Sequence, residues 1–173
     1  MPGEGGRERA MSLKRNNINE TGLYDEQVFK LLAEYELSRA QRYPSPVTVL
    51  YISINLEQAK PEIAKSVEQL FAGILNTSLR ISDIPGYFGK DFLVLMPATD
   101  ENGAQAAASR LIAKLKGTRN FVDGNLFKFK IHIGIATHPG GRDVSVDKLL
   151  QQAESALQNA RQAGPQAYKV FSE

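Results

Sequence analysis

Residues 86–97 read Gly86-Tyr-Phe-Gly-Lys-Asp-Phe-Leu-Val-Leu-Met-Pro97 and combine a turn with an apolar run. The run Phe92–Met96 has the composition and length of a buried strand. A second strand is predicted over about Ser82–Tyr87, and the residues from Phe88 to Asp91 between them form a tight turn. This stretch therefore predicts two consecutive strands in the middle of the chain.

Helices and strands alternate on both sides of this hairpin. Helices are predicted where apolar residues recur at spacings of three and four, and strands where β-branched and aromatic residues gather. Tyr24, Val28, Leu31 and Tyr35 mark the first helix. The further elements are a strand over Val47–Ile54, a helix opened by Pro61, a helix capped by Thr99 or Asp100 and ended at Gly117, a long strand with Phe127, Phe129, Ile131, Ile133 and Ile135, a helix capped by Ser145 and ended at Gly164, and a strand over Tyr168–Phe171.

The order of elements predicts the fold class. It runs α, β, α, β, β, α, β, α, β and contains the βαββαβ unit of a ferredoxin-like sheet. We expect an α+β fold with an antiparallel or mixed central sheet flanked by helices. Residues 1–18 are Gly-rich and polar and lack any period, which predicts a flexible tail, and residues 19–173 form one domain.

Charge and composition exclude several classes of protein. Residues 1–18 carry four basic and two acidic side chains, which accounts for the whole net charge of +2. The rest of the chain is neutral, and this argues against a nucleic acid partner. No apolar run could cross a bilayer, so we expect no membrane insertion. The chain has no cysteine, which is compatible with the cytoplasmic location that we predict.

Four segments in the same order resemble motifs of GGDEF domains, the diguanylate cyclase family. The hairpin Gly86–Pro97 resembles RYGGDEF with its following strand. Glu20–Asp25 resembles LTGLYN, Lys130–Ala136 resembles TVSIGIA, and Ala153–Arg161 with the glycine after it resembles ADxALYxAK…G. The resemblance covers about residues 18–172. It implies a ferredoxin-like sheet akin to the polymerase palm, in agreement with the order of elements.

The resemblance also implies chemistry that this sequence is not equipped to perform. Diguanylate cyclases join two GTP molecules with the help of two divalent metals, which require carboxylate ligands. The family's metal carboxylate lies in an IDID-type run that reads Ile52-Ser-Ile-Asn55 here. Ser53 takes the ligand position and Asn55 the second Asp position. We interpret both as a polar strand end that enters a loop.

The family's guanine-binding loop and its hairpin acids are also altered. After Leu56–Lys60 the chain goes directly to Pro61, so the loop with its Asn and Asp is missing. The hairpin is one residue short. If the gap lies inside the turn, Gly89-Lys90 replace the two glycines and Asp91 the first acid, which we favour. If the gap lies upstream, Lys90 replaces the first acid and Asp91 the second, and either way one acid is lost.

The remaining family positions give the same interpretation. Arg161 stands where the family has a phosphate-contacting Lys, and Pro165 replaces an Arg beyond the glycine. His132 stands where the family has serine, and a lone histidine on a sheet is more often packed than catalytic. We therefore predict no catalytic residues, no bound metal, no cofactor and no diguanylate cyclase activity.

One ligand motif of the family is retained. Arg80-Ile-Ser-Asp83 fits the RxxD pattern at which many members bind cyclic di-GMP, and the five residues that follow keep the family spacing to Gly89. The alternative is an ordinary ion pair, which contributes little energy.

Three hypotheses follow, in this order. The first is a non-catalytic module that binds another protein or itself, the second a cyclic di-GMP receptor through Arg80 and Asp83, and the third a residual GTP-dependent cyclase. Because the sequence contains no recognisable sensor or phosphodiesterase segment, a signalling role would run through a separate protein.

Overall fold

The computed structural model describes residues 22–55, 61–117, 120–122, 124–127, 129–142, 145–165 and 167–173. The predicted tail, residues 1–18, lies outside the described residues. The elements are α2 (Glu26–Arg42), β1 (Val47–Asn55), α3 (Pro61–Ser78), β2 (Ile84–Phe88), β3 (Asp91–Pro97), α4 (Glu101–Gly117), β4 (Asn120–Val122), β5 (Asn125–Phe127), β6 (Lys130–His138), α5 (Val146–Gln162) and β7 (Ala167–Val170).

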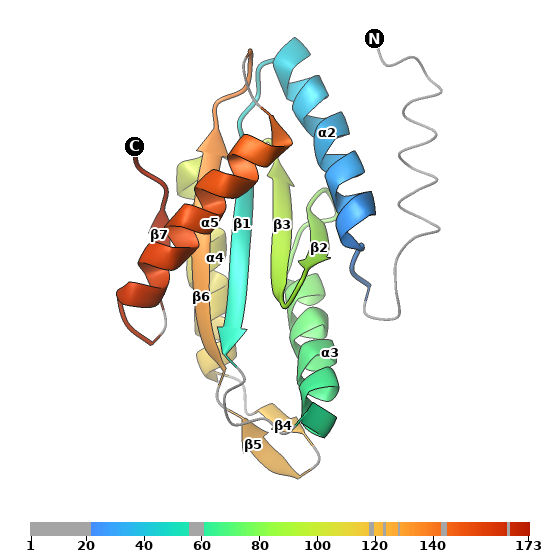
Figure 1. Cartoon of the computed structure of the whole chain (residues 1–173), viewed down its shortest axis with the longest axis vertical. Helices are drawn as coiled ribbons and strands as arrows, with labels where there is room; N and C mark the ends of the chain where they lie inside the picture. The colour runs from blue at the N-terminus through green and yellow to red at the C-terminus, as the bar shows by residue number, and fades with distance from the viewer. Residues whose placement is uncertain are drawn as a thin grey trace.

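A five-stranded mixed sheet in the order β2-β3-β1-β6-β7 forms the centre of the molecule (Figure 1). β1 pairs antiparallel with both β3 and β6, and β7 pairs parallel with β6. The unit β1-α3-β2-β3-α4-β6 gives the ferredoxin-like strand order β2-β3-β1-β6. The predicted α+β class and the βαββαβ core are confirmed.

Helices cover both faces of the sheet, so the molecule has three layers. Figure 1 shows α2 and α5 in front of the sheet and α4 behind it. Alternation along β1 divides the core: Leu50 and Ile52 pack with α3 and α4, whereas Val49 and Tyr51 pack with α2 and α5. Because β1 is apolar on both faces and central, its residues Val47–Ile52 are all buried.

Short polar side chains begin three of the helices. Asp25 accepts a hydrogen bond from the Val28 backbone N–H at the start of α2, and Ser145 accepts one from the Lys148 N–H at the start of α5. Asp100 Oδ1 accepts from the backbone N–H of Gly103 at 2.8 Å. Asp100, rather than Thr99, therefore caps α4.

The face of the first helix was predicted only in part: Tyr24 is buried and Val28 packs against the core, as expected. Leu31, expected to point inward, is 44% exposed. The buried residues of α2 are Phe29, Leu32, Ala33, Leu37 and Ala40. Two apolar stripes compete on this helix, and the stripe with two small alanines packs more closely on the sheet.

The predicted long strand is interrupted. Phe127 ends β5, which pairs with β4 in a separate two-stranded sheet, and β6 begins only at Lys130. Gly124 has φ = +79°, which fits a turn between β4 and β5. The alternating aromatic pattern continues across this break, so the sequence does not reveal it.

The central hairpin has a two-residue turn. Phe88 faces Asp91 across β2 and β3, which leaves Gly89 and Lys90 as the turn. Gly89 has φ = +63°, and a Cβ placed there would meet nothing within 4 Å. Glycine is therefore favoured by backbone conformation, and the tight turn is confirmed. β2 begins at Ile84, later than predicted, and β3 is one residue longer at each end.

Candidate functional site

Ser53 and Asp91 lie side by side at one end of the sheet. In the register of β1 and β3, Ile52 faces Phe92, so the next residues along each strand, Ser53 and Asp91, oppose one another. Alternation puts both side chains on the face covered by α5. On the other side of β1, Ser53 faces His132 of β6. Two predicted positions, one on a strand and one in the hairpin, thus come together.

Arg161, in the last turn of α5, reaches across to both of these side chains. Its Nη2 donates to Ser53 Oγ at 2.9 Å and lies 3.9 Å from Asp91 Oδ1. The arginine and aspartate side chains are 39% and 24% exposed. The three positions therefore form one polar cluster, which we call the Ser53 cluster (Ser53, Asp91 and Arg161).

α5 can place Arg161 there because it lies very close to β6. A Cβ built on Gly134 of β6 would fall on the backbone of Ala153 and Leu157. Only glycine permits this approach of helix to strand. Gly134 is part of the segment that resembles TVSIGIA, and the structure gives a packing reason for a glycine at this position.

Burial and neighbouring charges set the protonation behaviour of the cluster. Burial raises the pKa of Asp91 above its ordinary value, while Arg161 and a hydrogen bond from Ser53 lower it and Glu154 raises it again. Burial, with help from Asp91 and Glu154, raises the pKa of Tyr51 to about 12. Among the described residues, the favourable charge that acts on the partly buried Asp91 carboxylate is the guanidinium of Arg161.

Two neighbours of the cluster were missed by sequence reasoning. Tyr51 lies two residues before Ser53 on the same face of β1, and Glu154 lies seven residues before Arg161, which is about two helical turns. These spacings were available in the sequence. The spacings alone do not indicate that Tyr51 and Glu154 are neighbours, because this depends on the contact between β1 and α5.

The other predicted positions do not join the cluster as ligands. Asn55 ends β1 opposite Lys130, and Gly89 and Lys90 are exposed in the hairpin turn. The expected loss of the guanine-binding loop falls on residues 56–60, outside the described residues, although α3 does begin at Pro61 as predicted.

His132 has a structural partner. Its Nε2 lies 2.6 Å from the carbonyl oxygen of Gly164, just after α5. The contact joins β6 to the end of the helix. The interpretation of His132 as a hydrogen-bonded residue of the sheet agrees with this geometry.

The donors of the Ser53 cluster do not fit a pair of divalent metals. Hard cations such as Mg²⁺ require several anionic oxygens, and the cluster offers one carboxylate, one hydroxyl and one guanidinium. Across the described residues, no group of three or more His, Asp or Glu side chains could hold a metal ion.

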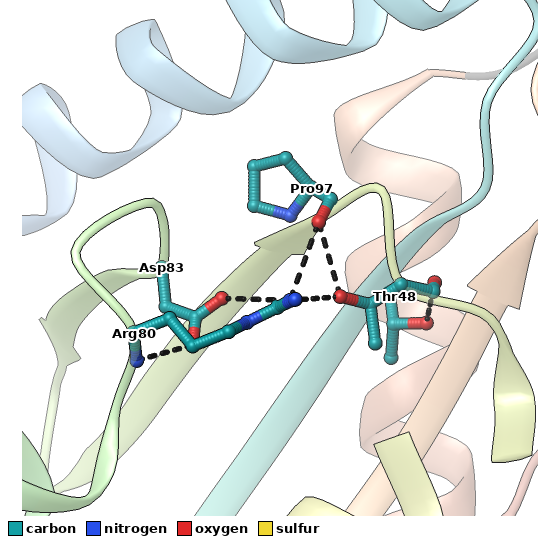
Figure 2. Close-up of polar contacts among 5 residues, drawn as sticks. Thr48, Arg80, Asp83 and Pro97 are labelled. Atoms are coloured by element: carbon teal, nitrogen blue, oxygen red, sulfur yellow. Dashed lines mark hydrogen bonds and ion pairs between the residues drawn. The ribbon is translucent and has the colours of Figure 1, made fainter. Parts of the chain in front are cut away.

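Arg80 and Asp83 lie at the opposite end of β1 and β3, in the connection between α3 and β2 (Figure 2). The Asp83 side chain is 1% exposed, accepts from the Arg80 backbone N–H at 2.9 Å and accepts from Arg80 Nη2 at 3.4 Å. The same Nη2 donates to Thr99 Oγ1 and, at 3.5 Å, to the Pro97 carbonyl. Thr48 Oγ1 donates to the Thr99 carbonyl at 2.8 Å. We call these five residues the Arg80 network.

The two members of the RxxD pattern differ in accessibility. The Arg80 side chain is 54% exposed, whereas both oxygens of Asp83 are engaged within the network. Of the two, only the guanidinium is open to a ligand in this conformation.

Residues 62–167 match the family model of the diguanylate cyclase GGDEF domain. The chain belongs to the GGDEF family. The match includes the hairpin, Arg161 and the Arg80 network except Thr48. It begins after β1, so Ser53, which lies on β1, is outside the matched residues. Among curated proteins, none matches the sequence.

Solved GGDEF domains have the same fold. The GGDEF domain of TpbB (YfiN) from Pseudomonas aeruginosa is 23% identical, with a TM-score of 0.77 over 91% of this chain and 95% of that one. The GGDEF domain of DgcB from Caulobacter crescentus, in complex with cyclic di-GMP, is 10% identical, with a TM-score of 0.81 over 91% and 97%. The diguanylate cyclase SiaD from Pseudomonas aeruginosa, in complex with its activator SiaC, is 20% identical, with a TM-score of 0.79 over 91% and 63%.

These identities support the fold and not a shared activity. As for membranes, the described part of this GGDEF domain includes no helix with the length and apolarity of a bilayer span.

Proposed function

We propose that this chain is a catalytically inactive GGDEF domain that acts in cyclic di-GMP-type signalling by binding another protein. The observation that carries the proposal is the position of Arg161, whose guanidinium lies against both Ser53 and Asp91. A cation of the chain itself stands beside the one carboxylate of the cluster. Its charge opposes the approach of a metal ion to that carboxylate.

The physical chemistry of phosphoryl transfer supports an inactive site. Two-metal catalysis stabilises the transition state by several kcal/mol, and each 1.36 kcal/mol changes the rate about tenfold. Serine and asparagine at positions 53 and 55 stand where the family's IDID-type run has two carboxylates, so neutral groups replace them. Loss of the metals would therefore reduce turnover by a few powers of ten.

A protein partner is the second part of the proposal. The structure of SiaD with its activator SiaC is an example of a diguanylate cyclase of similar fold in complex with a protein. Self-association is the alternative form of the same role. A cytoplasmic location also belongs to this proposal, and cell fractionation with antibody detection tests it.

Turnover of GTP tests the proposed function. The purified full chain is incubated with GTP and Mg²⁺ or Mn²⁺, and cyclic di-GMP is measured by chromatography beside an active diguanylate cyclase. We expect no product above the protein-free control. Cyclic di-GMP formed by this chain and lost in Asp91→Ala would instead establish the residual cyclase.

A cyclic di-GMP receptor is the second candidate, and the exposure of the Arg80 side chain (54%) favours it. Guanidinium can bind a guanine edge or a phosphate. The DgcB domain was solved with cyclic di-GMP. We rank this candidate behind the first because Asp83 is buried and fully hydrogen-bonded. A ligand that binds Asp83 would have to replace the internal hydrogen bonds of this carboxylate.

Calorimetry separates the two candidates. Titration of cyclic di-GMP into the full chain gives no heat of binding if the domain acts only through proteins. Saturable binding that Arg80→Ala removes, while Arg110→Ala on the exposed face of α4 retains it, would support the receptor.

A further inference from the structure

The two edges of the central sheet differ. At one edge, Tyr24 covers β2: its N–H donates to the Pro85 carbonyl at 3.0 Å, and its carbonyl accepts from the Tyr87 N–H at 2.9 Å. At the other edge, no further strand of the described residues lies beyond β7. An uncovered strand edge offers unpaired backbone groups to another chain.

The register of β7 identifies which backbone groups face outward. Phe171 donates its N–H to the Ile135 carbonyl of β6 at 2.8 Å. In a parallel ladder, successive residues alternate in the side toward which their N–H and C=O groups point. Tyr168 and Val170 therefore direct their backbone donors and acceptors away from the sheet.

A groove of about 470 Å³ lies beside this edge, between α4 and β7. Its lining includes small and apolar side chains and two lysines, among them Ile112, Ala113, Ala167, Lys116 and Lys169. Both lysines are exposed, and none of the described residues that line the groove is acidic. The Tyr168 hydroxyl donates to Gln105 Oε1 at 3.4 Å, which holds its ring against α4.

We propose that an extended, acidic segment of a partner protein binds here as an added strand on β7. Its backbone pairs with Tyr168 and Val170, and alternate side chains enter the groove, where a carboxylate meets Lys116. Because Tyr168 and Val170 pack toward α4, the Lys169 side chain points to the opposite face of β7, where a carboxylate on the intervening side chains meets it. This is the β-augmentation mode of peptide recognition, in which main-chain hydrogen bonds give affinity and side-chain pockets give specificity. The inference rests on the proposed function and names the surface and the partner chemistry.

Charge selects this occupant over the alternatives. A second copy of the chain would bring another Lys116 and Lys169 to the same place, and like charges in contact are unfavourable. A nucleic acid would need a basic stripe along its backbone, whereas the chain beyond residue 18 is neutral overall. An acidic peptide matches both the lysines and the strand edge.

Peptide selection tests the proposal without knowledge of the native partner. A random heptapeptide display library is selected on the full chain, and the enriched peptides are synthesised and titrated into the ¹⁵N-labelled protein. We expect an acidic consensus and amide shifts centred on residues 167–171. No enrichment, a neutral or basic consensus, a footprint elsewhere, or self-association through β7 would overturn the proposal.

Charge reversal and backbone methylation then test the two parts of the binding mode. The double variant Lys116→Glu/Lys169→Glu should weaken binding about tenfold or more, from two reversed ion pairs. Lys114→Glu is the matched control: Lys114 lies on the same helix but bonds Thr77 and Ser78 of α3, so binding should stay within about twofold. N-methylation of alternate peptide amides should abolish binding with no effect on the protein fold.

Undiminished affinity in the double variant, or of the methylated peptide, would contradict the added strand. The outcome is separate from that of the proposed function. If the groove binds no peptide, the added strand on β7 is excluded, and the proposed inactive domain that binds a protein through another surface still stands. If the chain synthesises cyclic di-GMP, the proposed function is excluded, whatever the groove binds.

Discussion

Two arginine–aspartate pairs lie at opposite ends of β1 and β3, and they differ in how completely each aspartate is satisfied. Asp83 is 1% exposed and accepts from a backbone N–H and from Arg80. Asp91 is 24% exposed and lies 3.9 Å from Arg161, beyond hydrogen-bond distance. Burial raises its pKa because these contacts only partly replace water.

This contrast separates a carboxylate that is fully hydrogen-bonded within the fold from one that is only partly satisfied. The Arg80 network joins the α3–β2 connection to the end of β3, so the fold depends on it. The Ser53 cluster holds one poorly satisfied carboxylate beside an arginine, which is what the proposed inactive domain predicts. Substitutions should therefore affect the two regions unequally.

Gly134→Ala should have the largest effect, and of the two regions it should disrupt the Ser53 cluster. The added methyl group would fall on the backbone of α5, so the helix and Arg161 must move away from the sheet. We expect a loss of about 3 kcal/mol in the free energy of unfolding, measured by urea denaturation.

Gly73→Ala is the matched control, because a Cβ there meets nothing within 4 Å in helix α3. Alanine in a helix interior should stabilise by about 0.5–1 kcal/mol. A Gly134→Ala protein as stable as the wild type would show that α5 is not seated by this glycine.

Asp83→Ala should come next, with a loss of about 2 kcal/mol. It leaves the Arg80 backbone N–H without its partner and releases the guanidinium from the turn. Thermal and urea unfolding measure the effect. Asp147→Ala, on the exposed first turn of α5, should cost less than about 0.5 kcal/mol. Equal losses in the two variants would contradict a structural role for Asp83.

Asp91→Asn should have the smallest effect, visible mainly as a change in pH dependence. The folded pKa of Asp91 is raised, so folding favours its protonated form. Its contribution to stability is present below the ordinary value of 3.8 and is lost as pH rises through the folded pKa. The variant lacks this loss, so its stability relative to wild type should rise across that window. A difference that is flat with pH would show that the pKa of Asp91 is not raised.

The sequence predicted the sheet well because its strands carry strong local signals. β1 is β-branched and aromatic and is buried along most of its length, and the hairpin turn has a glycine where a positive φ is needed. The prediction of the buried face of α2 was partly wrong because two apolar stripes compete on one helix. The break after Phe127 was not predicted because the pairing of β5 with β4 does not change the alternating pattern of the sequence.

The sequence predicted which residues belong to the site, but it did not predict how their side chains contact one another. Ser53, Asp91 and Arg161 were named from the family resemblance, yet Ser53 and Arg161 are 108 residues apart and their contact depends on the seating of α5. Similarly, the RxxD pattern gave no indication that Thr99 and Pro97 would bond to Arg80. Long-range contacts of this kind follow from packing rather than from spacing.

Binding of Mn²⁺ with GTP tests the central claim most directly, since Mn²⁺ substitutes for Mg²⁺ at oxygen sites. Electron paramagnetic resonance measures free Mn²⁺ during titration of the full chain in the presence of GTP. We predict that the chain does not reduce the free signal below that of Mn²⁺ with GTP alone. Uptake of two Mn²⁺ ions per chain, abolished by Asp91→Ala, would contradict the account.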